Sequence, residues 1–249
     1  MLTPERHQLI INLLHERHTV KMKELVQHTQ SSESTIRRDL DQLEQEGHLR
    51  RVHGGASLRQ GTMEEPSVGE KVTQYHQEKT LIAKYAASLV RDGDCIFIDA
   101  GTTTYEMIPH LSNKDIIVVT NGLNLLDLLT EHRIKTYALG GYVKHRTRAV
   151  IGASAVQNLH QYRFDQCFMG TNGLTGDDGF TTPDPEEAAI KTTALTLSQE
   201  KFVLADHSKF GKVAFCKIAS LEDADVITNY QGPLLKDYQE KTSIKVVRT

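Results

Sequence analysis

The chain has 249 residues, 39% of them hydrophobic, which is enough apolar material for one or two domains with a buried core. The 29 basic and 32 acidic residues leave a formal net charge of −3, so no overall charge field indicates a nucleic-acid or membrane partner. Any such partner must be bound by a local surface. The three cysteines lie far apart without a Cys-x-x-Cys pair, which argues against a disulfide framework and against a zinc ribbon.

The chain starts without the basic and apolar run of a signal peptide, and no apolar stretch approaches the roughly 18 residues of a membrane span. We therefore expect a cytoplasmic protein with no membrane partner. Polar and breaker residues concentrate over residues 59–66, as in a linker. The expected domains cover residues 1–58 and 76–249, and a linker over residues 59–75 joins them.

The first domain is predicted to consist of three helices and a hairpin. Apolar residues recur at helical spacing after Thr3-Pro4, mark a short second helix, and line one face of a third helix that Ser31-Ser32 precede and Gly47 ends. The hairpin turns at His53-Gly54-Gly55. The apolar positions are Leu9, Ile10, Leu13 and Leu14 in the first helix, Met22, Leu25 and Val26 in the second, and Ile36, Leu40 and Leu43 in the third.

Polar and cationic side chains occupy the face of the third helix that its apolar residues leave open. An α-helix fits the major groove of DNA, and guanidinium groups match guanine edges or phosphates. A helical mini-bundle in which Arg37 pairs with Asp41 explains the same pattern, and spacing and charge alone leave both interpretations open. The candidate DNA-contacting residues are Ser34, Thr35, Arg37 and Arg38 on the helix, and Arg50, Arg51 and His53 on the hairpin.

After residue 67, short apolar strands alternate with helical stretches. Continuous apolar strands separated by helices predict an α/β fold class, with a mostly parallel sheet that helices cover on both faces. A helical stripe over residues 81–90 precedes the first strand. The expected strands are Cys95–Ile98, Ile116–Val119, Ile134–Leu139, Gln166–Met169, Phe202–Ala205, Val226–Thr228 and Ile244–Val247.

The loop over residues 99–104, Asp-Ala-Gly-Thr-Thr-Thr, follows the first strand and leads into an expected helical stretch over residues 105–111. Gly101 lets the backbone approach an anion, and the threonine hydroxyls and amides donate hydrogen bonds to it. A sugar phosphate fits this chemistry, although a Gly-Thr-Thr-Thr loop taken alone is better explained as an ordinary capped turn. The chain contains neither of the glycine-rich nucleotide motifs, so nucleotide hydrolysis and dinucleotide binding lose their usual anchors.

Other loops after the expected strands carry polar residues that would meet at the carboxyl ends of the strands, where open α/β sheets bind ligands. These loops contain Asn121, Gly140-Gly141 and Asn172. Lys209 is the best single cation for a phosphate, and a solvated loop lysine is its plain alternative. Acidic residues over 184–187 start another helix, where they serve equally well as helix caps.

The order of residues in the first domain resembles the winged helix-turn-helix of the DeoR family of bacterial transcription regulators. The resemblance implies that the third helix enters the major groove and that the hairpin is the wing. It also implies that Asp39 holds an arginine in place and contacts no base. The matching residues are Arg6, Ile10, Leu14, the run Ser32–Leu40, Gly47 and the run Arg51–Ala56.

The second domain resembles the sugar-phosphate-sensing domain of the same family, which is related in fold to ribose phosphate isomerase and coenzyme A transferases. The resemblance implies that residues 99–104 form a phosphate loop with Lys209 as the counter-charge, and Asp165, Gly170, Gly173, Glu187 and Lys191 fall on family motif positions. Segments 139–147, 161–165 and 181–185 resemble the fructose operon repressors of Gram-positive bacteria, which implies fructose 1-phosphate as the effector. The expected effector-binding residues are Asp99, Gly101, Thr102, Thr103, Thr104, Asn121, Gly140, Gly141, Arg146, Asn172, Glu187, Lys191 and Lys209.

Three function classes remain open at this point. A ligand-controlled repressor explains both domains. A phosphosugar isomerase would use Glu186 or Glu187 for proton transfer, and a structural DNA-binding protein would ignore small molecules. We expect the repressor, with no enzymatic activity and no cofactor. We also expect no metal, because His15 and His18 lack the spacing of a zinc site.

Paired recognition helices need half-sites that protein symmetry sets, so we expect a homodimer or homotetramer on operator DNA. We expect the sugar phosphate to lower operator affinity by favouring a domain arrangement that no longer fits the half-sites. The segment from residue 59 to about 75 is the expected coupling element.

Overall fold

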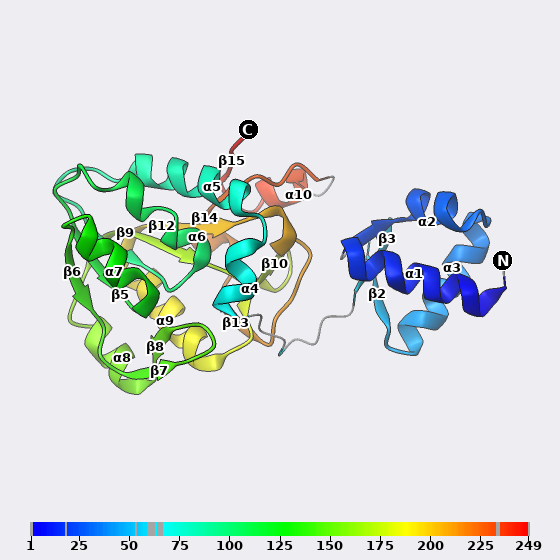
Figure 1. Ribbon diagram of the computed structural model, residues 1–249, viewed down its shortest axis with the longest axis horizontal. Coiled ribbons are helices and arrows are strands. Elements are labelled where there is room, and N and C mark those ends of the chain that lie inside the picture. Colours follow the sequence, from blue (N-terminus) through cyan, green and yellow to red (C-terminus); the bar gives the residue numbers. More distant parts are fainter. Residues whose placement is uncertain are drawn as a thin grey trace. The chain divides into compact units, whose positions relative to one another are not determined.

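The computed structural model describes residues 2–17, 19–52, 54–58, 63, 67–232 and 235–248 (Figure 1). The chain divides into two compact units, Met1–Gly61 and Thr62–Thr249. Each unit has its own hydrophobic core, and the larger unit has two apolar clusters. No helix in the described ranges is long and apolar enough to cross a membrane.

The N-terminal unit has the winged helix-turn-helix fold that its sequence predicts. Ser32 caps the third helix, since its Oγ accepts a hydrogen bond from the backbone N–H of Thr35 at 3.3 Å. Gly47 follows that helix with φ of +81°, a conformation that favours glycine. The elements are α1 (Thr3–Arg17), β1 (Thr19–Lys21), α2 (Met22–Thr29), α3 (Glu33–Gln45), β2 (Leu49–Val52) and β3 (Gly55–Leu58), with strand order β1-β3-β2.

The C-terminal unit is built on a seven-stranded sheet in the order β15-β14-β12-β9-β4-β5-β6. Every neighbouring pair in this sheet is parallel, which confirms the predicted α/β class. Each expected strand is present, with bounds that differ by up to four residues. The strands are β4 (Cys95–Ile98), β5 (Ile117–Thr120), β6 (Lys135–Ala138), β9 (Phe164–Gly170), β12 (Ser198–Ala205), β14 (Asp225–Thr228) and β15 (Ile244–Val246).

Helices cover both faces of this sheet, as the apolar strands require. Side chains alternate along β4, so Ile96 and Ile98 pack in one apolar cluster and Phe97 packs in the other. Figure 1 shows α5 on one side of the sheet and α8 and α9 on the other. The first cluster includes α5 (His76–Leu89) and α7 (Leu126–Glu131), and the second includes α8 (Ala153–Leu159) and α9 (Pro185–Thr196).

Several elements differ from the sequence-based expectation. The helix expected over residues 105–111 is wrong: the chain forms a short helix α6 (Thr102–Tyr105) and a separate 3-10 turn at Ile108–His110. Pro109 lies in that turn and has no N–H for a continuous helix. A hairpin of β7 (Tyr142–Lys144) and β8 (Ala149–Ile151) was not expected, nor was a small antiparallel sheet of β10 (Gly173–Thr175), β11 (Gly179–Thr182) and β13 (Cys216–Ala219).

Two further short helices complete the larger unit, α4 (Val68–Thr73) and α10 (Leu235–Gln239). Helix α4 lies within the range 59–75 that the sequence assigns to the linker. Its first N–H, that of Val68, donates a hydrogen bond to the carbonyl of Arg146 at 3.1 Å. The last part of the proposed linker therefore contacts the sensor unit, while the boundaries 1–58, 59–75 and 76–249 remain a proposal.

Candidate functional sites

A cavity lies where the strand order of the large sheet reverses. The chain runs from β4 to β5 and β6 on one side, and later strands start with β9 on the other side of β4. At such a switch point the loops after neighbouring strands diverge, and the space between them binds ligands in open α/β sheets. The expected effector residues that line the cavity are Asp99, Gly101, Thr102, Thr103, Asn172, Glu187, Lys191 and Lys209.

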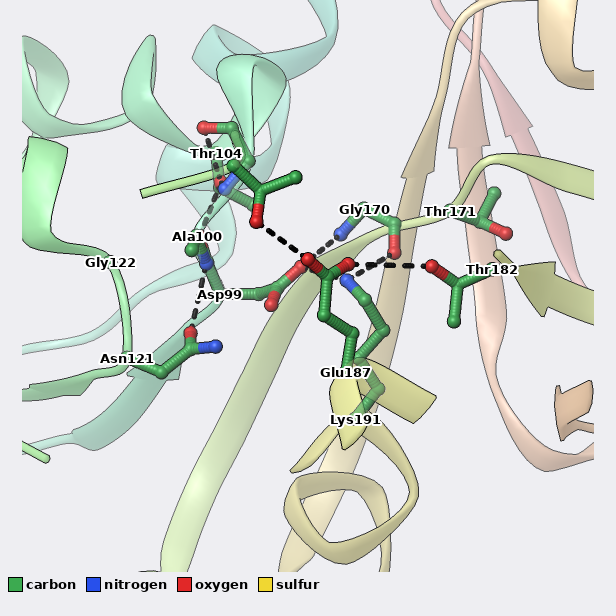
Figure 2. A network of polar contacts seen from close by, with 12 residues as sticks. Asp99, Ala100, Thr104, Asn121, Gly122, Gly170, Thr171, Thr182, Glu187 and Lys191 are labelled. Carbon is green, nitrogen blue, oxygen red and sulfur yellow. Dashed lines mark hydrogen bonds and ion pairs between the residues drawn. The ribbon is translucent and has the colours of Figure 1, made fainter. Parts of the chain in front are cut away.

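Lys191 and Asp99 form an ion pair in this cavity, and they are only 6% and 2% exposed. Figure 2 shows that Lys191 reaches from α9 toward the ends of β4 and β9. Its Nζ contacts the Asp99 carboxylate and donates to the Gly170 carbonyl at 3.0 Å. The N–H of Gly170 donates to the same Asp99 carboxylate at 3.1 Å. The ammonium and the amide together compensate the buried negative charge.

Glu187 presents a second carboxylate to the cavity from the first turn of α9. Its Oε1 accepts a hydrogen bond from Thr147 Oγ1 at 2.6 Å and lies 3.2 Å from Lys144 Nζ. Its Oε2 has a longer contact of 3.5 Å with Thr182 Oγ1 (Figure 2). A carboxylate oxygen with such a long contact can accept a hydrogen bond from a ligand hydroxyl.

Asp184 precedes α9 and holds the start of this helix in place. Its Oδ1 accepts hydrogen bonds from the N–H groups of Glu186 and Glu187 at 2.7 and 3.3 Å. Burial alone would raise the pKa of Asp184, but the hydrogen bond from Lys144 and those from the backbone outweigh it and lower the pKa. The expected capping role of the acidic residues over 184–187 is confirmed for Asp184, and Glu187 lines the cavity as well.

Two expected effector residues, Thr104 and Asn121, hold the backbone of the loop after β4 and do not line the cavity. Thr104 Oγ1 donates to the carbonyl of Asp99 at 2.7 Å and accepts from the N–H of Gly101 at 3.0 Å. Asn121 Oδ1 accepts from the N–H of Ala100 at 2.9 Å (Figure 2). Thr104 and Asn121 are both buried and do not line the cavity, so the geometry gives them a positioning role.

The structure does not bring Gly140, Gly141 and Arg146 to the cavity. The N–H of Gly140 donates to Asn158 Oδ1 at 3.3 Å. Gly141 packs against β8, where a side-chain Cβ would lie 2.7 Å from the carbonyl of Ile151. Arg146 is exposed on the β7–β8 loop. Gly140 and Gly141 precede β7, and Arg146 lies in the β7–β8 loop, whose next residue, Thr147, lines the cavity.

Two lysines that line the cavity carry no sequence signal. Lys71 belongs to α4 and Lys79 to α5, and Lys79 is only 4% exposed. Burial lowers the pKa of Lys79, and the carboxylate of Asp206 partly offsets this. The lining thus contains four lysines, counting Lys191 and Lys209, against the two carboxylates of Asp99 and Glu187, an excess of 4 − 2 = 2 positive charges.

Asp206 is a buried neighbour of these lysines at the end of β12. Burial alone would raise its pKa, but the charges of Lys209 and Lys79 and hydrogen bonds from Ser208 outweigh burial and lower it. Its Oδ2 lies 4.0 Å from Lys209 Nζ and has no hydrogen-bond partner in the described ranges. Lys79 and Lys209 therefore act on one buried carboxylate from two different elements.

The exposed face of α3 carries the candidate DNA-contacting residues. Arg37 bonds Glu33 at 2.6 Å within the same helix, which differs from the Arg37–Asp41 pair of the mini-bundle alternative. Asp41 pairs with Arg51 of the wing. Arg38 is exposed, and within the described part of the chain its guanidinium forms no hydrogen bond or ion pair.

The remaining expected contacts of the first unit are positioned as follows. The hydroxyls of Ser34 and Thr35 lie 3.0 and 2.8 Å from Ser32 Oγ at the start of α3. Arg50 lies in β2 and is exposed. His53 lies outside the described residues. The first turn of α3 and the wing strand thus present polar groups, and their contact with bases or phosphates remains a prediction.

Comparison with known proteins assigns both units. The model of the DeoR-like helix-turn-helix domain matches residues 6–62, and the model of the DeoR C terminal sensor domain matches residues 74–230. The chain belongs to the DeoR family. The uncharacterized HTH-type transcriptional regulator FruR of Bacillus subtilis (strain 168) is 51% identical to this DeoR-family chain over 250 residues, 100% of each chain.

More distant relatives of the DeoR-family chain are also regulators. The lactose phosphotransferase system repressor of Staphylococcus epidermidis is 33% identical over 248 residues, 98% of each chain. Among solved structures, ribose 5-phosphate isomerase A of Methanocaldococcus jannaschii is similar over 54% of each chain, with 19% identity and a TM-score of 0.41. Relatives that match this chain over 98–100% of its length are named as regulators and repressors, so the chain is a transcriptional regulator and not an isomerase.

Proposed function

We propose that this DeoR-family regulator represses a sugar catabolic operon and is released from its operator by a sugar phosphate bound at the switch-point cavity. The observation that carries the proposal is the charge of the cavity lining, which has an excess of two positive charges. A phosphate monoester carries a charge of about −1.5 to −2 at pH 7. The lining therefore favours an anionic group such as a phosphate.

The polar groups of the cavity differ from one end to the other. Lys79 contacts the backbone carbonyl of Lys71, and Lys79 and Lys209 both act on Asp206, so the ammonium groups of Lys79 and Lys209 lie on the same side of the cavity lining. A phosphate fits this end, because ammonium and hydroxyl groups donate hydrogen bonds to its oxygens. Glu187 and Asn172 offer acceptors and donors to sugar hydroxyls at the other end.

Fructose 1-phosphate is the proposed effector. Two observations support it: the 51% identity to FruR over the whole chain, and the segments over 139–147, 161–165 and 181–185 that resemble fructose operon repressors. Fructose 1-phosphate combines one phosphate with several hydroxyls, which suits the lysines and the acceptor groups of the cavity lining.

The DNA-binding residues are proposed to be Ser34, Thr35, Arg37 and Arg38 of α3, with Arg50, Arg51 and His53 on the wing. One such domain makes few contacts, so we propose a homodimer or homotetramer whose paired α3 helices read two half-sites. Effector binding then lowers operator affinity by its differential preference for one arrangement of the units. The segment 59–75 couples the two events.

Fluorescence anisotropy tests the proposal. The full-length protein is titrated onto DNA from upstream of its own operon and then exposed to a panel of sugar phosphates that includes fructose 1-phosphate. Specific binding that fructose 1-phosphate reverses supports the whole proposal, and reversal by another sugar phosphate corrects the effector alone. Specific binding that no compound changes would remove the sensing claim, and the absence of specific binding at low salt would remove the repressor claim.

A further inference from the structure

Helix α4 is both the first helix after the linker and a wall of the effector cavity. Val68 and Lys71, at the start and middle of this helix, line the cavity. The helix is capped locally, because Ser67 Oγ accepts from the N–H of Glu70 at 3.3 Å and Glu70 Oε2 accepts from the N–H of Ser67 at 2.6 Å. A change in how α4 is held therefore reaches the cavity and the linker together.

Two contacts hold α4 to different sides of the cavity. The N–H of Val68 donates to the carbonyl of Arg146 at 3.1 Å, and Lys79 Nζ contacts the carbonyl of Lys71. Each of these two contacts involves a residue that lines the cavity or is next to one in sequence. Thr147, which follows Arg146 in sequence, donates to Glu187, and Lys79 lines the cavity itself.

A bound sugar phosphate competes directly with the Lys79 contact and acts on the Val68 contact through Glu187 and Thr147. A phosphate dianion accepts charge-assisted hydrogen bonds and is a stronger acceptor than the neutral Lys71 carbonyl, so it draws Lys79 Nζ away from α4. A sugar hydroxyl that donates to Glu187 Oε2 moves the carboxylate whose Oε1 accepts from Thr147, and this shifts the loop that carries the Arg146 carbonyl.

We infer that α4 is a latch, which the contacts to the Arg146 carbonyl and to Lys79 dock on the sensor unit and which effector binding releases. The inference rests on the proposed function and explains how effector binding in the cavity lowers operator affinity. A docked α4 ends the tether between the units at Ser67, and an undocked α4 extends that tether to residue 75. Doubling the length of a tether lowers the effective concentration of the second DNA-binding unit by about threefold.

Val68→Pro tests the latch because it removes one hydrogen-bond donor and leaves the helix intact. Val68 is the first residue of α4 and follows Ser67, whose backbone is extended with φ −62° and ψ 162°. Proline suits the first position of a helix and favours an extended preceding residue. The matched control is Val68→Ala, which keeps the N–H and removes side-chain atoms from the cavity wall.

Three measurements on the full-length variants decide the question. Hydrogen exchange reports the docking of residues 67–75, anisotropy reports operator affinity without effector, and calorimetry reports binding of fructose 1-phosphate and of inorganic phosphate. Relative to Val68→Ala, we expect Val68→Pro to exchange faster in α4, to bind the operator at least about threefold more weakly and to bind fructose 1-phosphate more tightly, since linkage acts in both directions.

The latch is overturned if the two variants have equal exchange in α4, equal operator affinity, or a tighter operator complex for Val68→Pro. Failure of the proposed function gives a different result. In that case the wild-type protein binds neither fructose 1-phosphate nor inorganic phosphate, while the exchange and operator measurements still report on the docking of α4.

Discussion

The guanidinium of Arg6 donates two hydrogen bonds to the carboxylate of Asp39, from Nε to Oδ2 at 2.5 Å and from Nη2 to Oδ1 at 2.8 Å. The pair joins α1 to the buried face of α3, where both residues are less than 8% exposed. Asp39 shares that face with Ile36 and Leu40, while the preceding Arg38 is exposed. Apolar contacts alone allow a helix to rotate, whereas a two-pronged ion pair sets its orientation. Asp39 thus holds Arg6 in place, as the family resemblance implies, and the orientation that the pair gives α3 leaves Arg38 exposed.

Removing one partner of this pair is expected to destabilise the DNA-binding unit. Asp39→Asn leaves a buried guanidinium opposite a neutral amide, and breaking a buried pair costs about 3–5 kcal/mol. The double variant Arg6→Met with Asp39→Leu replaces the pair by apolar side chains, so we expect it to regain most of that stability while its preference for the operator over unrelated DNA falls. Urea unfolding and anisotropy on both DNAs measure the two effects. An undiminished preference in the stable double variant contradicts the orienting role.

Because of the same pair, we expect the free energy of unfolding of the DNA-binding unit to fall at acid pH. Burial alone would raise the pKa of Asp39, but hydrogen bonds from Arg6 and His7 outweigh it and lower the pKa. Asp39 of the unfolded chain therefore binds a proton more readily than Asp39 of the folded chain. The pair stabilises the fold fully above about pH 3.9, the ordinary pKa of aspartate. This stability is lost as the pH falls through the lower pKa of Asp39 in the folded state. Urea unfolding of the wild type between pH 5 and 2 is expected to be steeper in pH than that of the Arg6→Met, Asp39→Leu variant. Parallel profiles would contradict the assignment.

The sequence predicted the parts of the fold that depend on local apolar pattern. The strands of the parallel sheet are continuous apolar runs such as Cys95–Ile98, because both faces of that sheet are buried. The hairpin of β7 and β8 was not predicted because each of its strands has only three residues, too few to show a hydrophobic period. The helix expected over residues 105–111 does not form because Pro109 lacks the N–H that a continuous helix needs there.

The cavity was predicted only in part, because the strand order of the sheet and not a local pattern brings its residues together. Asp99 and Lys191 are 92 residues apart, and the strand order of the sheet brings them into contact. The family motif identified both residues, while spacing alone could not pair them. Lys79 resembles any charged residue of an amphipathic helix, and its burial in the cavity depends on the packing of α4 and α5, which no local pattern encodes.

Arg38 is expected to contribute more to operator recognition than Arg37. The guanidinium of Arg37 is already bonded to Glu33, whereas Arg38 has no such partner within the described residues. Arg38→Ala should cost about 1–3 kcal/mol of specific binding, and Arg37→Ala should cost less. Anisotropy on operator and mutated operator DNA measures both. A larger loss for Arg37→Ala would show that Glu33 releases its partner when DNA binds.

Arg50 on the wing is expected to contact a phosphate and not a base. Arg50→Ala should then weaken binding to operator and unrelated DNA alike, and lower the slope of log affinity against log salt by about 1. Anisotropy titrations at several salt concentrations give that slope. An unchanged slope with a loss confined to the operator would place Arg50 on a base edge.

Lys79→Met is expected to abolish the effector response at little cost in stability. Burial lowers the pKa of Lys79, so its site already penalises the charge, and methionine fills the same space without one. The contact with the Lys71 carbonyl is lost, which offsets part of the gain, so the free energy of unfolding of the sensor unit should stay within about 1 kcal/mol. Calorimetry should show at least about tenfold weaker binding of both fructose 1-phosphate and inorganic phosphate. Unchanged phosphate affinity would remove Lys79 from the phosphate end.

Glu187→Gln separates the sugar end of the cavity from the phosphate end. The carboxylate accepts hydrogen bonds from Thr147 and Thr182, and glutamine keeps one acceptor oxygen but replaces the other by a donor. A sugar hydroxyl that donates to Glu187 loses a charged acceptor worth about 1.5–3 kcal/mol, whereas inorganic phosphate makes no such contact. We therefore expect roughly tenfold or greater weakening for fructose 1-phosphate and little change for inorganic phosphate in calorimetry. Equal weakening of both ligands would contradict the division of the cavity into a sugar end and a phosphate end.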